Sequence, residues 1–377
     1  MLIAITLVVI VLASLLFHYI NPWHPPALAS NWQQMDDTLT ITFVITGIFF
    51  VILNLFLVYV IWRFRRRGAK AAETVVYQPV NHRLERWLTA ITTVGIVALL
   101  APGLKVYADY VRPPYDAMEV EVLGSQWQWR YRFPGADAKL GGTDARFVSA
   151  GNPFGLDPND ANGQDDALVE ANELHLPLGR PVKILLRAQD VLHDFYVPPF
   201  RARMNMVPGM VTTFWFKPTQ TGRFEAMCAQ LCGVGHAAMR GVVVVEEEPA
   251  FQAWLKSKPS FAAATAPAPA AAATAEGAAT ADPVAQGLAV AKAKACVACH
   301  SADGSAGVGP SWKGLYGKTE SFADGSKEAM NEATLAREIR EPTAKVVQGF
   351  APIMPKSELS EAEVAALVAY IRSLGKS

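Results

Sequence analysis

Residues 228–239 read CAQLCGVGHAAM, and they place two thiols, an imidazole and a thioether within one short segment. Thiolate and thioether sulfur favour copper, imidazole also suits it, and two cysteines one short loop apart can bridge two copper ions. This is a ligand pattern and not a packing pattern. It indicates a copper site built on Cys228, Cys232, His236 and Met239.

A site for two copper ions needs one more protein side chain. Upstream, residues 191–198 read VLHDFYVP and place His193 in an apolar, strand-like run, from which a loop of another strand could carry it to the site. The alternative is a disulfide between Cys228 and Cys232 in an exported domain. That alternative leaves the placement of the histidine and the methionine unexplained.

A second motif, CVACH at residues 296–300, is the pattern in which Cys296 and Cys299 attach a c-type haem and His300 ligates its iron. A second axial methionine raises the reduction potential, and the downstream candidates are Met330 and Met354. We favour Met354, because it lies in the proline-bounded extended segment APIMP, whereas Met330 lies in a polar, helix-like run. The two motifs use all four cysteines, and both sites require an oxidising, exported compartment.

Both motifs resemble known families. The copper pattern resembles the binuclear copper A centre of heme-copper oxidase subunit II, over roughly residues 37–254. The chain after His300 resembles class I cytochromes c, because GPSWKGLYG at 309–317 matches their glycine-rich loop and 361–374 reads as their closing amphipathic helix. The cytochrome resemblance covers roughly residues 283–377. Together they resemble the subunit II that carries a fused cytochrome c.

The resemblance to subunit II implies roles that spacing alone would not assign. Trp127, in SQWQWRY at 125–131, matches the aromatic motif through which electrons enter the copper centre, although a buried indole in a β-sandwich is most often packing. Asp194 could orient a ligand or cap a loop. For copper, the implied set is Cys228 and Cys232 as bridges, His193 and His236 as ligands of one copper each, and Met239 and the Gln230 carbonyl as weak ligands.

Two positions depart from the family pattern. Many members have a glutamate between the bridging cysteines that also reaches a magnesium ion at the subunit interface, but here the residue is Gln230, which keeps the carbonyl and loses the charge. Glu85 resembles a glutamate at the mouth of a proton channel, yet Trp87 falls one residue closer than usual. Beside Arg83 and Arg86, Glu85 could instead be an ion-paired anchor at the bilayer edge.

Composition indicates a membrane protein of two or three domains. The chain has 377 residues, 51% of them hydrophobic, and its mean hydropathy is positive. Apolar runs predict helices near residues 2–17, 40–62 and 88–104 within a helical region at 1–110. The zero formal net charge argues against nucleic acid as a partner.

The basic cluster after the second apolar run sets the expected topology. By the positive-inside rule the connection to the third helix is cytoplasmic, so everything after about residue 110 lies on the extracytoplasmic face. ALA at 27–29 before Ser30 resembles a signal-cleavage site, but we favour a retained helix because the proline-rich gap at 18–26 is long for a signal peptide. The cluster is Arg63, Arg65, Arg66, Arg67 and Lys70.

The rest of the chain divides by composition. Residues 116–254 predict an all-β sandwich, with strands at 118–123, 127–133, 182–186, 211–216 and 241–245, and the resemblance to subunit II implies that it is cupredoxin-like. The polar insertion at 135–172 is interpreted as a solvated loop, since its DPNDA run fails the spacing of a calcium site. Residues 262–281 are almost entirely Ala, Pro and Thr, which predicts a linker before an all-α cytochrome c domain at 283–377.

The resemblance implies that the chain is the electron-entry subunit of a cytochrome c oxidase, a translocase of the bacterial inner membrane whose dioxygen chemistry lies in a partner subunit. The expected cofactors are copper A and covalent haem c. The expected partners are cytochrome c, the catalytic subunit I, other oxidase subunits and membrane lipid. Alternatives are the same role in a copper A nitric oxide reductase, a stand-alone membrane-anchored electron carrier, or a copper-delivery protein. His18, His24, His82 and His175 share no spacing, which argues against a dioxygen site in this chain.

Overall fold

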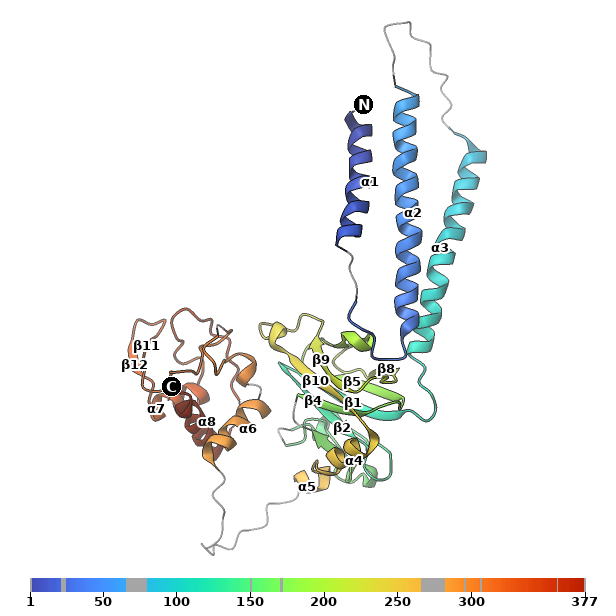
Figure 1. The fold of residues 1–377 in the computed structure, drawn as a ribbon. Helices are drawn as coiled ribbons and strands as arrows, with labels where there is room; N and C mark the ends of the chain where they lie inside the picture. Colours follow the sequence, from blue (N-terminus) through green and yellow to red (C-terminus); the bar gives the residue numbers. More distant parts are fainter. Residues whose placement is uncertain are drawn as a thin grey trace, which may run out of the picture. The chain divides into compact units, whose positions relative to one another are not determined.

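The computed structural model has three apolar helices, then a β-sandwich, then a small helical domain (Figure 1). The predicted fold class, N-terminal membrane-type helices followed by a cupredoxin-like sandwich and an all-α cytochrome c domain, is confirmed. The structure describes residues 2–21, 25–65, 80–149, 151–169, 172–265, 282–294, 296–305, 307–357 and 359–375.

The N-terminal helices are α1 (Leu2–Ile20), α2 (Gln33–Arg63) and α3 (His82–Tyr110). Each is long and apolar enough to cross a membrane. They extend beyond the predicted apolar runs because helical hydrogen bonding continues into flanking polar residues: the Asn81 side chain accepts from the Leu84 N–H at the start of α3. Of the predicted basic cluster, Arg63 ends α2, and Arg66, Arg67 and Lys70 lie outside the described residues.

The sandwich consists of two five-stranded sheets. Its core follows the two-residue period of a strand, so that along β5 the side chains of Val182, Ile184 and Leu186 are fully buried and those between them are not. One sheet has the order β3 (Ala167–Val169), β2 (Gln128–Phe133), β1 (Met118–Ser125), β5 (Val182–Ala188) and β8 (Thr212–Phe216), and the other has β4 (Glu173–Pro177), β10 (Arg240–Glu246), β9 (Gly222–Cys228), β6 (His193–Val197) and β7 (Ala202–Met206).

The predicted strands correspond to β1, β2, β5, β8 and β10, with Trp127 just outside β2. The strand β6 lies within the strand-like run at 191–198, whereas β3, β4, β7 and β9 fall outside the predicted strands. They are short or carry mixed polarity; β9, for example, contains arginine and glutamate and is exposed over much of its length. In such strands the alternation of apolar and polar residues is too weak to read from sequence.

The polar insertion is not a solvated loop throughout, so that interpretation is wrong for its middle. Phe154 is 1% exposed and Leu156 is 0% exposed, and both belong to a small second core with Leu123, Leu168 and Phe261. The Gly, Asn and Asp residues around them build turns, including the short 3₁₀ helices η1 (Ala145–Phe147) and η2 (Ala161–Gly163).

A buried ionic cluster fastens the insertion to the sandwich. The Arg132 guanidinium, 3% exposed, bonds the carboxylates of Glu121 and Asp166 and donates to the Gly141 carbonyl at 2.9 Å. Burial raises the pKa of Asp166 to about 6, although the Arg132 charge opposes that rise. A buried arginine is stable only where partners of this kind accept its hydrogen bonds. The cluster therefore holds Gly141 and Asp166 of the insertion against Arg132 of β2.

Two short helices follow the last strand: α4 (Glu248–Lys256) and α5 (Phe261–Thr265). The segment between them lies along the insertion, because the Leu168 N–H donates to the Pro259 carbonyl at 3.0 Å and the Ala262 N–H to the Gln164 carbonyl at 3.0 Å. The first residues of the predicted linker therefore lie in α5. The rest of it, 266–281, lies outside the described residues.

The C-terminal domain packs α6 (Pro283–Ala293) against α8 (Glu361–Ser373). Gly287 permits this close approach, since a Cβ there would lie 2.0 Å from the Ala366 carbonyl oxygen. A reciprocal Ser360–Glu363 capping box begins α8. The other elements are η5 (Cys296–Ala298), β11 (Thr319–Ser321), β12 (Lys327–Ala329) and α7 (Glu332–Arg340).

Candidate copper and haem sites

The copper site forms where two neighbouring strands end. β6 begins at His193 and β9 ends at Cys228, and the two strands pair antiparallel with Phe195 opposite Cys228. This register brings His193 Nδ1 to 3.9 Å from Cys228 Sγ, although the residues are far apart in sequence. The position of His193 therefore depends on the sheet and not on residues 228–239, which are called the copper loop below.

The loop after β9 folds back on itself and gathers the other donors. Cys232 Sγ lies 3.7 Å from Cys228 Sγ, 3.6 Å from His236 Nδ1 and 3.9 Å from Met239 Sδ. The Gln230 carbonyl oxygen lies 3.1 Å from Cys228 Sγ. The Cys228 N–H closes the loop by donating to the Met239 carbonyl, and His236 lies in the 3₁₀ turn η4 (His236–Ala238). The structure thus brings all six predicted copper residues together.

Burial and mutual contacts change the acidity of these groups. Burial raises the pKa of Cys228, but hydrogen bonds from His193 and from backbone N–H groups outweigh it and bring the pKa to about 6. Burial and the Cys228 charge raise the pKa of Cys232 to about 12. Burial lowers the pKa of His193, but its bonds to Asp190 and Cys228 outweigh that and raise it to about 9. Two soft sulfurs, two imidazoles and a thioether at these spacings fit a copper pair.

The Asp190 carboxylate is a functional group that the sequence interpretation missed. Its Oδ1 lies 2.8 Å from His193 Nε2, and the carboxylate also accepts from the backbone N–H groups of Gln126 and Val191, each at 2.7 Å. A carboxylate that holds the outer nitrogen of a histidine leaves the inner nitrogen free for a metal. The available signal was an aspartate three residues before the histidine.

Asp194 has a different position from that of Asp190. Its carboxylate, 2% exposed, bonds Arg203 Nε at 3.1 Å, and its carbonyl accepts from the Ala229 N–H at 3.0 Å. Arg203 also donates to the Ala229 carbonyl at 3.2 Å. Asp194 therefore fixes the first residue after Cys228 and does not orient His193.

Trp127 lies against the copper loop and is 8% exposed. Its Nε1–H donates to the Cys232 carbonyl at 3.2 Å, and the Gln126 side chain donates to the same oxygen at 2.9 Å. A Cβ at Gly235 would lie 2.3 Å from the indole ring, so only glycine fits beneath it. The indole is therefore in direct contact with the segment that joins Cys232 to His236.

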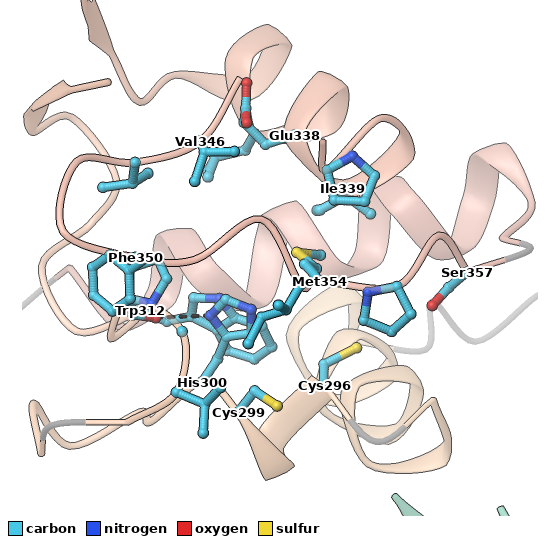
Figure 2. A pocket seen from close by; sticks show the side chains of 18 of the residues that line it. Cys296, Cys299, His300, Trp312, Glu338, Ile339, Val346, Phe350, Met354 and Ser357 are labelled. Atoms are coloured by element: carbon cyan, nitrogen blue, oxygen red, sulfur yellow. Dashed lines mark hydrogen bonds between the residues drawn. The ribbon is translucent and has the colours of Figure 1, made fainter. Parts of the chain in front are cut away.

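The haem site lies in a pocket of the C-terminal domain. Figure 2 shows Cys296 and Cys299 beside His300, with Met354 on a separate segment that also lines the pocket. The His300 Nδ1 lies 2.8 Å from the Pro310 carbonyl oxygen, so Nδ1 carries the hydrogen. The unprotonated Nε2 is left with a lone pair that can bind a metal. Burial lowers the pKa of His300. A neutral imidazole, two thiols and an apolar lining fit a covalent haem.

The two methionine candidates differ in their surroundings. Met330 is 2% exposed and packs in the hydrophobic core of the domain, and its backbone is held by bonds to Lys318 and Gly317. Met354 is half-buried and lies in an extended segment without regular structure. Both line the pocket, but only Met354 is free of a core-packing role.

Glu85 lies in the first turn of α3, and its Oε2 is 3.5 Å from His82 Nδ1. Both side chains are largely exposed. The described contacts therefore pair Glu85 with a histidine, and not with Arg83 or Arg86 as the anchor alternative supposed.

The fold and these two sites define a class: a membrane-type electron-transfer protein with a copper site in a sandwich and a haem site in a cytochrome c domain. Family models agree, with "Cytochrome C oxidase subunit II, periplasmic domain" matching residues 118–247 and "Cytochrome c" matching residues 284–375. The chain belongs to the cytochrome c oxidase subunit 2 family.

The chain is similar to several known proteins, and the first of them shows this membership. The chain is 50% identical over 262 residues to the alternative cytochrome c oxidase subunit 2 of Bradyrhizobium diazoefficiens, a match that covers 70% of this chain and 94% of the relative. It is 24% identical to cytochrome c oxidase subunit 2 of Alkalihalophilus pseudofirmus, over 91% of this chain and 87% of the relative. A crystal structure of the periplasmic domain of cytochrome oxidase subunit II of Bradyrhizobium japonicum matches 38% of this chain and 95% of that chain, with 25% identity and a TM-score of 0.28.

Membership makes the protein a subunit of cytochrome c oxidase with an electron-entry role. Copper A and haem c are the cofactors that the two domain families imply. Magnesium is not supported: the neutral Gln230 side chain stands where the family's glutamate carboxylate would be, and the group of side chains close enough to share a metal ion, among the described residues, is His193, Cys228 and Cys232.

Proposed function

We propose that this chain accepts electrons from a reduced cytochrome c at its C-terminal domain, passes them to the copper loop, and delivers them to a catalytic subunit that reduces dioxygen to water. The observation that carries the proposal is the convergence of His193 with the donors of the 228–239 loop beneath the Trp127 ring. When bound, the haem and the copper pair supply one-electron exchange without making or breaking covalent bonds.

The proposed copper roles follow from the donor atoms. Cys228 Sγ is near His193 and Cys232 Sγ is near His236, so the two cysteines would hold the copper pair together and each histidine would bind one copper. The Met239 thioether and the Gln230 carbonyl lie at the edges, where weak ligands belong. The proposed copper A ligands are His193, Cys228, Gln230 through its carbonyl, Cys232, His236 and Met239.

In the C-terminal domain, Cys296 and Cys299 would hold the haem and His300 and Met354 would be its axial ligands. The Pro310 carbonyl accepts from His300 Nδ1, which leaves the Nε2 lone pair available to an iron. Many apolar residues line the haem pocket, and in the copper site His193, Cys228, Cys232 and Met239 are buried. Electron transfer is fast where the surroundings need not rearrange, and buried, hydrogen-bonded ligands meet that condition.

Two further residues receive proposed roles. Trp127 is the proposed point of electron entry to the copper loop, because its ring touches that loop and its Nε1–H bonds the Cys232 carbonyl. Glu85 is the proposed point of proton entry toward the partner subunit, because it is exposed at the start of α3 and lies within 3.5 Å of a histidine that can exchange a proton with it.

The three apolar helices support a location in the inner membrane of a bacterium, with three spans and with the copper and haem domains on the periplasmic face. The proposed partners are the catalytic heme-copper subunit I, other oxidase subunits, membrane lipid, and cytochrome c as donor. Residues 262–281 are proposed to act as the tether between the two electron-transfer domains.

The test is oxygen uptake by the complex purified through a tag on this chain and supplied with reduced cytochrome c, beside a Cys228→Ser variant. Uptake that is lost in the variant, with its haem content unchanged, is the expected result. A complex that retains copper and haem but consumes no oxygen would overturn the oxidase proposal. The same preparation supplied with nitric oxide then tests the nitric oxide reductase alternative.

A further inference from the structure

The haem-domain loop after CVACH contains an indole in an unusual place. Trp312 is 6% exposed, and its ring stacks on the His300 imidazole with ring centroids 5.1 Å apart and an interplanar angle of 11° (Figure 2). The ring of Tyr370, on α8, meets the indole edge-on at 6.0 Å and 88°. The indole therefore lies between the proposed axial ligand and the closing helix of the domain.

The backbone around the indole is fixed on both sides. The Trp312 N–H donates to the Ser301 carbonyl at 2.8 Å, and the Ser311 hydroxyl donates to the same carbonyl at 3.0 Å. Ser301 follows His300 directly, so the loop is bonded to the residue next to the ligand. A Cβ at Gly309 would lie 2.7 Å from His300 Cε1, which leaves no room for a side chain there.

We propose that Trp312 is a positioning residue for the haem iron: it holds the plane of the His300 imidazole and links that plane to α8 through Tyr370. The bond from Nδ1 to the Pro310 carbonyl fixes one point of the ring but leaves rotation about the axis of that bond. A flat partner stacked at 11° removes this rotation. The inference rests on the proposed haem site at Cys296, Cys299 and His300.

The indole also excludes water from one side of the ligand. An oxidised haem carries one more positive charge than a reduced haem, and water stabilises the more charged form. Replacing Trp312 by a smaller aliphatic side chain opens space beside His300. We therefore expect the Trp312→Leu variant to have a lower haem reduction potential than the wild type.

The experiment uses the full chain loaded with haem and copper. In a spectroelectrochemical titration, we expect Trp312→Leu to shift the equilibrium between oxidised and reduced haem about tenfold, or about 59 mV for one electron. Its ferric EPR spectrum, which responds to the orientation of the axial ligands, should broaden. Trp312→Phe keeps a stacked ring and should restore most of both signals.

The matched control is Val368→Ala, which removes volume from the same core at a residue that is 3% exposed and is not among the described residues that line the haem pocket. It should lower thermal stability without moving the potential. The proposal is overturned if Trp312→Leu loses stability like the control but keeps the wild-type potential and EPR spectrum. Failure of the haem site itself is distinguishable, because then the wild type would show no covalent c-type spectrum.

Discussion

Asp190 is the residue whose removal takes away the support of the His193 ring. Its carboxylate holds His193 Nε2 and two backbone N–H groups, so Asp190→Ala removes three contacts while leaving every proposed ligand in the chain. Loss of such an outer partner typically costs about 10–100-fold in metal affinity. We expect copper retention against a competing chelator to fall by that factor.

Asp190→Asn is the matched control for this prediction. The amide keeps an oxygen acceptor of the same size, so the variant should retain most of the affinity that alanine loses. Haem content should be unchanged in both variants, since the carboxylate contacts only residues of the sandwich. Copper retention in Asp190→Ala equal to that of the wild type would contradict the orienting role.

Met354 and Met330 give a second test at the scale of single residues. Methionine ligation raises the reduction potential of a haem, so Met354→Leu should lower the potential and remove the iron–sulfur charge-transfer band of the ferric form. Met330→Leu preserves volume in a core position and should keep both signals. The reverse outcome would move the axial ligand to Met330.

The structure brings together the side chains predicted as copper donors, and most of the predicted copper and haem donors lie in two short motifs, where spacing alone decides which atoms can meet. Asp190 could not be predicted in the same way. Its contact with His193 depends on the turn between β5 and β6, and its contact with Gln126 on a separate loop after β1. Contacts that join distant segments leave no local pattern.

At the scale of elements, the insertion is the clearest difference from the sequence interpretation. The insertion has few apolar residues. The small core that they form also contains Phe261, which comes after β10 in the sequence. The local composition of the insertion, rich in Gly, Asn and Asp, predicts a loop. Long-range packing decides the outcome, because Phe154 and Leu156 are buried only where Phe261 covers them.

Phe261→Ala tests whether this small core holds α5 against the insertion. Phe261 is 2% exposed, and deletion of a buried phenylalanine ring costs about 3–5 kcal/mol. The backbone bonds of Leu168 and Ala262 lie on either side of it. We expect hydrogen exchange at these two amides to accelerate by about 100-fold or more, at about 1.4 kcal/mol per tenfold.

The control for the Phe261 variant is Met210→Ala, at a side chain that is 58% exposed on the turn between β7 and β8. A surface substitution of this kind changes stability by less than about 0.5 kcal/mol, so exchange at Leu168 and Ala262 should stay at its wild-type rate. If Phe261→Ala exchanges no faster than this control, the segment is held by its backbone bonds alone.

In the haem domain, Glu328 of β12 joins two elements through charge. Hydrogen bonds from Lys345 and from Arg337 of α7 hold the pKa of Glu328 below its usual 4.5. A lowered pKa means that the folded state binds the proton less tightly than the unfolded state. The stabilisation is therefore present above pH 4.5 and is lost as pH falls through the lowered pKa.

Glu328→Gln should thus lower the Tm of the haem domain at pH 7, measured by the haem absorbance during unfolding, and the difference from wild type should narrow as pH falls below 4.5. Glu332→Gln is the control, because its carboxylate is 69% exposed and lies 3.7 Å from an exposed arginine. Such surface pairs contribute little. A difference in Tm that persists unchanged to acidic pH would show that the Glu328 effect is not electrostatic.

At the scale of the whole molecule, the proposed tether at 262–281 determines how often the haem domain meets the copper domain. A short flexible linker gives an effective concentration in the millimolar range. Cleaving an engineered protease site within residues 266–281 should therefore turn haem-to-copper transfer from a concentration-independent process into a bimolecular one. At micromolar protein we expect the rate to fall by about 100- to 1,000-fold, measured after rapid reduction of the haem.

Two comparisons make this test specific. The uncut protein with the same inserted site should keep the wild-type rate, and doubling the tether should slow transfer only about threefold, since effective concentration falls roughly as the −3/2 power of length. Raising the concentration of the cut protein should restore the rate in proportion. A cut protein that keeps a fast, concentration-independent rate would mean that contacts between the domains, and not the tether, hold donor and acceptor together.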